Sequence, residues 1–484
     1  MSIVESVTFV TPEIILLVAA IIILAASFFV NNKNVLGVFA LAAIVAASLC
    51  LPQSHKTAPA LFFNMLTNDS FSLFFKEISL FIAGIVILFS MGYKELTEKY
   101  IGEYYFLLLN GTIAMLLAVS SNNLLMIYLS LEMLSLISYM LVAFLRNNPL
   151  SSEGALKYFL FGALSTGIML YGISLTYGLF GTTDLSAISK ALNAGQINGS
   201  ASSILLVLIL AGIGFKCTMV PFHMWAPDVY QGAPTAVTAF ISVGPKAVGF
   251  ALLLRIFANS FFPLDANWVS LMTLISIFTM TIGNVIAISQ TDIKRMLAYS
   301  SIAQAGYMLI GFVVGSASGV GSASGIEGVL YYIMAYALMN LGAFGCVILV
   351  SNSIRSDAIE DYAGLHKKDP VTSFMLSIFL LSLVGVPPLA GFWGKFLVFT
   401  AAIESKFILL AIAGVVNSVV AAFYYMRVIK CMYLDEPKVK DAGPRSVPLQ
   451  IALAVVMAGV LIAGLHLTPF LNWVRLSQFF LPQQ

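Results

Sequence analysis

Long apolar runs follow one another along the whole chain, separated by short polar connections. A helix needs about 20 apolar residues to cross a bilayer core of about 30 Å. Runs of this length favour helices, because a membrane β-barrel shows short segments of alternating polarity instead. The pattern predicts an all-α polytopic membrane protein with about fourteen transmembrane helices, expected near residues 12–30, 35–51, 70–92, 104–120, 123–145, 153–179, 203–221, 235–258, 267–289, 296–315, 327–351, 371–401, 406–433 and 447–470.

Two of these runs are interrupted by proline. The seventh contains Pro221, five residues after Lys216. The twelfth contains Pro387 and Pro388, ahead of Lys395. Proline breaks a helix, and a broken backbone at membrane depth is tolerated where it lines a cavity or is covered by protein. We therefore expect discontinuous seventh and twelfth helices, each with a lysine near its break, as in inverted-repeat transporters; packing kinks beside incidental lysines are the simpler alternative.

The composition excludes most soluble classes of protein. Of the 484 residues, 60% are hydrophobic and 10% are charged, whereas a soluble protein has about 25% charged residues. The formal net charge of +2 gives no polyelectrolyte surface, so nucleic-acid binding has no electrostatic support. The four cysteines stand in apolar runs without a C-x-x-C pair, which favours small hydrophobic side chains over metal ligands or disulfides.

The basic residues set the expected orientation in the membrane. Fourteen of them lie in or beside loops that follow odd-numbered helices, against four on the opposite side. Because basic loops stay in the cytoplasm, we expect both chain termini outside it. The first group comprises Lys33, Lys94, Lys99, Arg146, Lys294, Arg295, Arg355, Lys367, Lys368, Arg427, Lys430, Lys438, Lys440 and Arg445, and the second comprises Lys56, Lys190, Lys406 and Arg475.

Three ionisable residues are expected near the middle of the membrane. Glu132, Lys216 and Lys246 lie about 14–20 Å from the starts of the fifth, seventh and eighth helices, by helical rise. A charge at this depth costs about 2.5–3.5 kcal/mol. A structural ion pair between Glu132 and one lysine is the simpler interpretation. Three charges at one depth favour a proton or ion pathway. A desolvated lysine releases its proton more readily, and a nearby carboxylate helps the lysine to keep that proton.

Further polar residues near the seventh helix carry a weaker signal. Lys157 stands four residues after Glu153, on one helix face near the cytoplasmic end, where a surface pair is as reasonable as a pathway role. His223 follows the break, where a histidine can relay protons or simply serve the structure. Asp228 stands between two prolines, where capping of a turn is the default.

Three more charges lie toward the outer ends of predicted helices, namely Lys76, Glu77 and Arg255. Long charged side chains in such positions bury their stems and extend the charged group to the membrane–water interface. We therefore expect these three side chains to reach that interface.

Several of these segments resemble the antiporter-like subunits of respiratory complex I. The resemblance rests on the helix that carries Glu132 and on the stretches GFKCTMVPFHMWAPDVYQGAPTAV (214–237), TDIKRMLAYSSIAQAGYM (291–308) and SLVGVPPLAGFWGKF (382–396). The P-F-H-x-W-x-P-D-V-Y-Q-G-A-P form is similar to the N subunit rather than to the L or M subunits. A lysine at position 395 is unlike the M subunit, where glutamate is usual.

The resemblance implies a fold and a pathway. The fold would be one integral membrane domain over 1–484, with N-terminal helices in 1–103, two inverted pseudo-repeats in 104–260 and 261–433, and a last helix in 434–484. The pathway would consist of Glu132, Lys216, Lys246, Lys395 and Lys157. The first two would be the coupled pair of the input half-channel, the third the central relay, the fourth the residue serving the outer half, and the last an accessory. His223 and Asp228 are further accessory candidates.

The resemblance also implies a proton-translocating membrane subunit of NADH:quinone oxidoreductase, driven by electron transfer in other subunits. The sequence has no nucleotide fingerprint, haem-type histidine pair or iron–sulfur cysteine set, so we expect no cofactor in this chain. NADH, FMN, iron–sulfur clusters and quinone are expected in partner subunits. The partners would be other antiporter-like subunits, small multispan subunits and membrane lipid. The expected location is the bacterial plasma (inner) membrane with both termini on the periplasmic side, a thylakoid or organelle membrane being the alternative.

Two other functional classes stay open. A subunit of a multisubunit sodium/proton antiporter would run on an ion gradient without a redox partner, and the PDVYQGAP form argues against it. A structural membrane anchor would tolerate replacement of the buried lysines. The electron donor, NADH or ferredoxin, is not determined by this chain, because the donor module lies in other chains.

Overall fold

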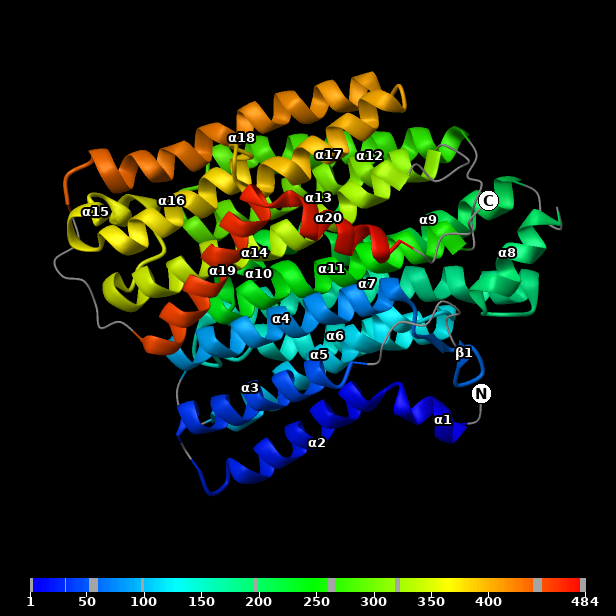
Figure 1. The fold of residues 1–484 in the computed structure, drawn as a ribbon, viewed down its shortest axis with the longest axis horizontal. Helices are drawn as coiled ribbons and strands as arrows, with labels where there is room; N and C mark the ends of the chain where they lie inside the picture. Colours follow the sequence, from blue (N-terminus) through cyan, green and yellow to red (C-terminus); the bar gives the residue numbers. More distant parts are fainter. Residues whose placement is uncertain are drawn as a thin grey trace.

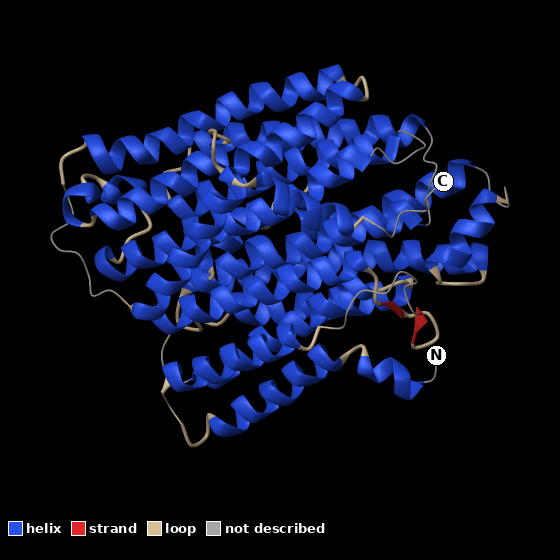
Figure 2. Cartoon of the chain, in the orientation of Figure 1, coloured by secondary structure: helices blue, strands red, loops and turns tan. Residues whose placement is uncertain are grey.

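The structure is a computed structural model that describes residues 3–30, 32–51, 60–96, 100–194, 199–259, 266–317, 323–437 and 446–478. Within these ranges the chain is almost entirely helical, and its one sheet is a short hairpin of β1 (Ala60–Leu61) and β2 (Leu66–Thr67), as Figure 2 shows. The prediction of an all-α chain is therefore confirmed. Some residues used to predict the orientation lie outside the described ranges, namely Lys56, Lys99, Lys438, Lys440 and Arg445.

The helices form one elongated bundle in which most axes run nearly parallel (Figure 1). In chain order they are α1 (Ile3–Thr8), α2 (Thr11–Ala26), α3 (Lys33–Leu49), α4 (Ser70–Gly92), α5 (Ile101–Ser120), α6 (Leu124–Val142), α7 (Pro149–Phe180), α8 (Leu185–Asn193), α9 (Gly199–Cys217), α10 (Ala226–Gly232), α11 (Thr235–Asn259), α12 (Ala266–Ile288), α13 (Ile293–Ala317), α14 (Ala323–Ile354), η2 (Ile359–Tyr362), α15 (Leu365–Lys368), α16 (Pro370–Val384), α17 (Ala390–Glu404), α18 (Ile408–Leu434), α19 (Val447–Leu465) and α20 (Leu467–Leu476).

Each predicted apolar run coincides with one of these helices, and the twelfth run coincides with α16 and α17 together. Ten helices of the described chain are long and apolar enough to cross a membrane. Four shorter apolar helices accompany them: Thr11–Ala26, Lys33–Leu49, Ser203–Cys217 and Pro370–Val384. The polytopic architecture follows from these lengths, whereas the number of fourteen crossings and the two inverted repeats stay predictions.

The helices are arranged in layers around a buried centre. In the most apolar 18-residue stretch of each helix, all residues of α11 and α14 and 94% of those of α13 are buried. The corresponding share is 39% in α7, α12, α18 and α19. In Figure 1, α18 and α12 form one edge of the bundle and α2 and α3 the other, with α11 and α14 between them. Apolar side chains exposed on the outer helices suit contact with lipid. Polar groups within these stretches of α11 and α14 are therefore held inside the protein.

Both predicted helix breaks are present. Helix α9 ends at Cys217, Thr218 has a φ of 58°, and the next helix begins at Ala226. Helix α16 ends at Val384, Gly385 has a φ of 93°, and α17 begins at Ala390. The seventh and twelfth predicted helices are therefore discontinuous, as expected from their prolines. Each break leaves main-chain carbonyls at the end of the preceding helix without helical partners.

The helices that the apolar runs did not predict are short: α1, α8, α10, η2, α15 and α20 have between 4 and 10 residues. They are too short to cross a bilayer and leave no 20-residue apolar signal. Figure 1 shows α1 on the side of the bundle that carries α8 and β1, with α15 on the opposite side. Which side faces the cytoplasm stays a prediction.

The structure corrects the expectation for two outer charges. Lys76 is 2% exposed and donates to Glu13 at 2.7 Å. Arg255 is 1% exposed and donates to both carboxylate oxygens of Asp69, at 2.8 and 2.9 Å. Because a carboxylate from another element neutralises each cation inside the protein, neither side chain extends to the interface. Glu77, by contrast, is exposed.

Candidate functional site

The site begins with Glu132 on α6 and Lys216 at the end of α9. Lys216 is 2% exposed, and its Nζ is buried without a hydrogen-bond partner, as is Oε2 of Glu132. Among the described residues no ion pair within 4.0 Å joins the two, although the Glu132 charge acts electrostatically on Lys216. The two groups are thus coupled at a distance, and each keeps an atom with free hydrogen-bonding capacity.

Aromatic rings hold the Lys216 ammonium. Its Nζ lies 5.5 Å from the ring centroids of both Tyr158 and Phe215, within the range of a cation–π contact. Trp225 stacks on Tyr158 with centroids 4.2 Å apart and donates from Nε1 to the carbonyl of Phe215 at 3.2 Å. That carbonyl is one of those released at the end of α9. The end of α9 therefore positions the aromatic side chains that pack beside Lys216.

Helices α9 and α11, which carry Lys216 and Lys246, pack closely against each other. A Cβ added to Gly249 of α11 would lie 2.6 Å from Sγ of Cys217 and 3.3 Å from Cβ of Lys216. Glycine therefore allows the two helices to meet at Lys216. Lys246 stands almost one turn before Gly249 on α11, directly after Pro245 inside that helix.

Lys246 is the centre of the first hydrogen-bonded group. It is 1% exposed and donates to both the carbonyl and the hydroxyl of Ser301 on α13. The Ser301 hydroxyl also accepts from the Tyr336 hydroxyl of α14 at 2.8 Å and lies 3.4 Å from that of Tyr230. Tyr336 can donate alternatively to the carbonyl of Ser242 at 3.2 Å. Lys246 thus meets a set of hydroxyl groups that can accept and pass on a proton.

Gln304, one turn after Ser301, is the centre of the second group. Its amide nitrogen donates to the carbonyl of Leu383 at 3.0 Å and to the Tyr425 hydroxyl at 3.4 Å. Its amide oxygen accepts from the Tyr332 hydroxyl at 2.5 Å. The Tyr425 hydroxyl is also hydrogen-bonded to that of Ser300. Ser300 and Ser301 are adjacent residues of α13, so the two groups lie side by side along this helix, with the two hydroxyls on different faces.

Lys395 is the centre of the third group. It is 4% exposed, donates to the carbonyl of Val384 at 2.8 Å, and lies 4.4 Å from the centroid of the Tyr307 ring. The Tyr307 hydroxyl accepts from Asn284 at 3.0 Å, and Asn284 accepts from Tyr424 at 3.0 Å. Polar contact continues from the lysine into α12 and α18, which border the lipid-facing edge of the bundle.

The break after α16 joins the second and third groups. Leu383 and Val384 are the last two residues of α16, and their carbonyls have no helical partners because the helix stops. One accepts from Gln304 and the other from Lys395. The predicted interruption therefore supplies two adjacent acceptors between α13 and α17.

Lys157 and Asp228 lie in a separate charged cluster. Lys157 pairs with Glu153 and with Asp228, each at 2.6 Å, which confirms the predicted Glu153 pair. The other oxygen of Asp228 accepts from Arg295 at 2.6 Å. Burial by itself raises the pKa of Asp228, but hydrogen bonds from Lys157 and Arg295 bring that pKa below its ordinary value. Asp228 therefore joins α7, α10 and α13 as a carboxylate, and the expectation that it caps a turn is wrong.

His223 lies in the segment between α9 and α10. It is 8% exposed, and its Nδ1 is buried without a hydrogen-bond partner. No hydrogen bond or ion pair connects its ring with Lys216 in the described part of the chain. Its position at the break agrees with the sequence, and its accessory role stays a prediction.

The sequence reasoning missed the side chains that link the lysines, chiefly Ser301, Gln304 and the tyrosines. A signal for them existed on α13: Ser300, Gln304 and Tyr307 recur at spacings of four and three residues, which places them on one face of a helix. A polar stripe on a helix that is otherwise fully buried requires internal partners. Residues of α14 at the same spacing, Tyr332 and Tyr336, would have been found in the same way.

The described residues contain no group of three or more His, Cys, Asp or Glu side chains that could hold a metal ion. What they do contain is a row of buried ammonium, hydroxyl and amide groups that runs from Glu132 through Lys216 and Lys246 to Lys395. Lysine can hold or release a proton when its surroundings change, and hydroxyl groups both donate and accept. The arrangement is suited to proton transfer within the protein.

Comparison with known proteins places these features in a wider group. The model of the family described as NADH:quinone oxidoreductase/Mrp antiporter, TM, matches residues 121–421. NADH-quinone oxidoreductase subunit N of Trichlorobacter lovleyi is 41% identical over 463 residues, which cover 94% of this chain and 93% of that protein. NAD(P)H-quinone oxidoreductase subunit 2 of Rippkaea orientalis is 43% identical over 444 residues, covering 89% and 84%. A chain of respiratory complex I from Thermus thermophilus with bound aureothin superposes with a TM-score of 0.81 at 30% identity, over 96% of this chain and 99% of that one.

Proposed function

The chain belongs to the family of NADH:quinone oxidoreductase and Mrp antiporter membrane subunits, and on that premise we propose that it translocates protons as the N-type subunit of an NADH:quinone oxidoreductase. The observation that carries the proposal is the row of buried groups from Glu132 to Lys395, in which each lysine is 4% exposed or less. Buried cations without paired carboxylates are costly. A role in carrying protons would explain why these lysines are kept in the interior despite that cost.

In the proposed mechanism a proton enters from the cytoplasm near Glu132 and is held on Lys216. When Glu132 moves away, Lys216 loses the charge that retains its proton and passes the proton toward Lys246. Lys246 hands it to the hydroxyl groups around Ser301, and the group around Gln304 connects these hydroxyls with Lys395. Lys395 then releases the proton on the opposite side of the membrane.

The energy for this transport must come from outside the chain. Moving one charge against 100 mV takes about 2.3 kcal/mol. In the proposed complex, electron transfer from NADH to quinone through FMN and iron–sulfur clusters takes place in partner subunits. Its effect would reach Glu132 as a change of charge and conformation at the subunit boundary, through neighbouring antiporter-like and small multispan subunits.

We place residues 104–260 and 261–433 as two inverted halves of one membrane domain, each with one broken helix. The breaks after Cys217 and Val384 support this division. The chain would lie in the bacterial plasma membrane, or in a thylakoid or organelle membrane, with both ends on the outer side. The excess of basic residues in the alternate loops supports that orientation.

Lys216→Ala tests the proposal. In inverted membrane vesicles, NADH-driven proton uptake should fall at least about tenfold, because a positioned proton-transfer group contributes about 10²–10⁴-fold. Electron transfer from NADH to an artificial acceptor such as ferricyanide should remain. Lys190→Ala, at an exposed lysine of α8, is the matched control.

Unchanged proton uptake in a fully assembled Lys216→Ala complex would contradict the proposal and favour a structural anchor. Purification through a tag on this chain distinguishes the redox-driven complex from a multisubunit sodium/proton antiporter. Flavin and iron–sulfur subunits should co-purify with NADH:quinone activity. Recovery with only other multispan antiporter subunits, and no redox centre, would indicate a gradient-driven cation/proton antiporter.

A further inference from the structure

Four polar atoms on α6, α7 and α9 are buried without a hydrogen-bond partner among the described residues. They are Oε2 of Glu132, Nζ of Lys216 and the hydroxyl oxygens of Tyr139 and Tyr158. The large majority of buried side-chain polar atoms in proteins have a partner in the protein or in ordered water. Because α7 packs against both α6 and α9, these four atoms belong to one region, in which donors and acceptors are free to exchange protons.

The two tyrosines lie between Glu132 and Lys216. Nζ of Lys216 is 5.5 Å from the centroid of the Tyr158 ring. The Tyr158 ring is 4.7 Å from that of Tyr139, with the two planes at 83°. The charge of Glu132 acts electrostatically on Tyr139, as it does on Lys216. The side chains therefore form a series that runs from α6 through α7 to α9.

Helix α7 makes room for the Tyr139 hydroxyl at Gly162. A Cβ added to Gly162 would lie 1.8 Å from that hydroxyl oxygen and 3.1 Å from Cζ of Phe215. By helical rise, Gly162 is about 20 Å from the first residue of α7, and Glu132 is about 15 Å from the last residue of α6. Since a short connection joins that end to that start, the hydroxyl reaches nearly the same depth as Glu132.

One face of α6 continues the series on the side of Glu132. Ser135 and Tyr139 follow Glu132 by three and seven residues, which places all three on one face of the helix. Ser135 is 0% exposed and donates to the carbonyl of Leu131 at 2.6 Å. Its oxygen can still accept a hydrogen bond. The polar groups between Glu132 and the two tyrosines are thus able to orient a moving proton.

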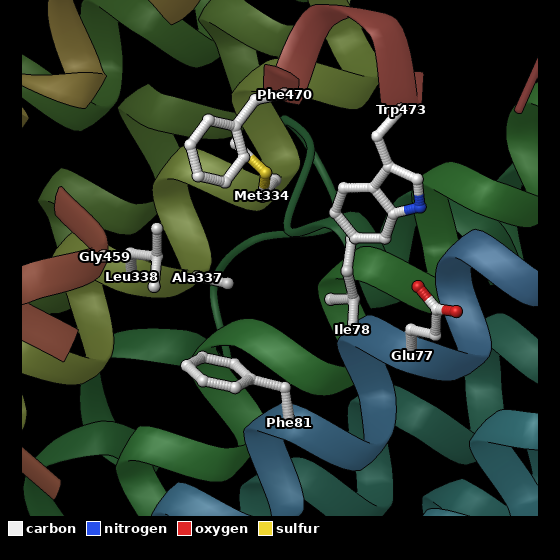
Figure 3. Close-up of a pocket in the computed structure, with 9 residues that line it drawn as sticks. All are labelled: Glu77, Ile78, Phe81, Met334, Ala337, Leu338, Gly459, Phe470 and Trp473. Atoms are coloured by element: carbon white, nitrogen blue, oxygen red, sulfur yellow. The ribbon is translucent and has the colours of Figure 1, made fainter. Parts of the chain in front are cut away.

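The cavity of about 260 Å³ between α4, α14, α19 and α20 has a different character. Its lining is almost wholly apolar, with Glu77 as the one charged residue (Figure 3). Proton transfer needs successive groups that both donate and accept. This cavity therefore does not extend the route, whereas the hydroxyls beside Lys216 do.

We propose that the hydroxyls of Tyr139 and Tyr158 carry the proton from Glu132 to Lys216, an inference that rests on the proposed function. Protonated Glu132 gives its proton to the oxygen of Tyr139, which releases the hydrogen it held toward Tyr158. Tyr158 passes a proton in the same way to the neutral amine of Lys216. Glu132 ends as a carboxylate, Lys216 ends as an ammonium, and both tyrosines are again neutral. Ordered water spans any step longer than a hydrogen bond.

Tyr139→Phe and Tyr158→Phe test the relay in the assembled complex, because each removes one oxygen atom and keeps the ring. In inverted membrane vesicles, NADH-driven proton uptake should fall about tenfold or more in each variant, while electron transfer to ferricyanide is retained. The ratio of uptake rates in H₂O and D₂O should rise, since proton transfer past the missing hydroxyl becomes the slow step. The thermal midpoint should be unchanged or slightly higher, because the lost hydroxyl has no partner in the protein.

Tyr104→Phe is the matched control. Tyr104 of α5 is 0% exposed, and its hydroxyl is likewise buried without a partner. This variant should leave both proton uptake and the isotope ratio unchanged.

The outcome with Lys216→Ala separates this inference from the proposed function. Full uptake with an unchanged isotope ratio in either tyrosine variant, in a complex where Lys216→Ala loses uptake, would overturn the relay alone. Reduced uptake with an unchanged isotope ratio and a lower thermal midpoint would also overturn it, because the tyrosines would then serve only packing. Full uptake in Lys216→Ala would overturn the relay and the proposed function together.

Discussion

Lys395 donates a hydrogen bond to the main-chain carbonyl of Val384 at 2.8 Å, across the break that separates α16 from α17. The acceptor exists because the helix ends there and leaves its last carbonyls without partners. The same helix end offers the carbonyl of Leu383 to Gln304. A broken helix in this protein is therefore a source of polar contacts for a buried cation, beside the polar side chains that α13 and α14 contribute.

Replacing Lys395 should block transport at its last step. Lys395→Ala removes the proton carrier and leaves the Val384 carbonyl without its donor. We expect NADH-driven proton uptake by membrane vesicles to fall at least about tenfold, while electron transfer to ferricyanide is retained. The control is Lys367→Ala, at an exposed lysine of α15. Full proton uptake by an assembled Lys395→Ala complex would show that the pathway leaves the protein elsewhere.

Replacing Gln304 should affect both stability and transport. Gln304→Met keeps the length of the side chain but leaves Leu383, Tyr332 and Tyr425 without a hydrogen-bond partner on it. Each buried group left unsatisfied costs about 1–3 kcal/mol, so the thermal midpoint of the purified assembly should fall, and proton uptake should slow. Gln450→Met on the exposed face of α19 is the control and should behave like the wild type. Normal transport in Gln304→Met would show that the path between Lys246 and Lys395 bypasses this amide.

The ion pair of Asp69 and Arg255 should give the protein an acid-sensitive stability. Burial by itself raises the pKa of Asp69, but Arg255 and hydrogen bonds from Ser72 bring that pKa below its ordinary 3.8. A lowered pKa in the folded state means that this contribution is complete above pH 3.8 and is lost as the pH falls through the lower folded value.

Asp69→Asn tests this contribution. The variant leaves Arg255 buried without its counter-charge, which costs about 3–5 kcal/mol. Its thermal midpoint at pH 7 should be lower than that of the wild type, and the difference should shrink as the pH falls below the ordinary carboxyl pKa. The double variant Asp69→Asn/Arg255→Gln should recover part of the loss. A difference that is the same at all pH values would contradict the assignment.

The features that could be predicted are those that depend on a single segment of the sequence and not on what that segment packs against. The apolar runs predicted the helices because burial of about 20 consecutive apolar residues needs no knowledge of the partner. Prolines predicted both breaks for the same reason, and Glu132, Lys216 and Lys246 stood out because a charge in an apolar run is costly wherever it packs.

The features that could not be predicted depend on which helices meet. The sequence predicts that Lys76 reaches the interface because it lies toward the outer end of its helix, whereas its partner Glu13 is 63 positions away. Arg255 and Asp69 are separated by 186 positions. The spacing of Ser300, Gln304 and Tyr307 marks a polar face on α13, but that the Gln304 amide donates to the carbonyl of Leu383 follows only from the end of α16 beside it. In each case the packing of helices, not the local pattern, determines the contact.

The contact between Gly249 and Cys217 gives a prediction that depends on packing alone. An added Cβ at position 249 would lie 2.6 Å from Sγ of Cys217, closer than side chains tolerate, so Gly249→Ala must displace the Cys217 side chain or move α11 away from α9. Overpacking of this kind costs about 1–3 kcal/mol. Because Lys246 and Lys216 stand on these two helices, proton uptake should fall together with the thermal midpoint.

A second substitution separates this packing effect from a general intolerance of alanine. Cys217→Ala removes the Sγ atom, so the double variant Cys217→Ala/Gly249→Ala should recover much of the lost stability and transport, the recovery being partial because Cβ of Lys216 would still lie 3.3 Å away. Gly167→Ala on α7, where nothing lies within 4 Å, should be neutral or slightly stabilising. If Gly249→Ala behaves like Gly167→Ala, or if Cys217→Ala rescues nothing, close contact of α9 with α11 does not set the alignment of the two lysines. If the rescue occurs, the spacing of Lys216 and Lys246 is controlled by one glycine and one sulfur atom that take no part in carrying the proton.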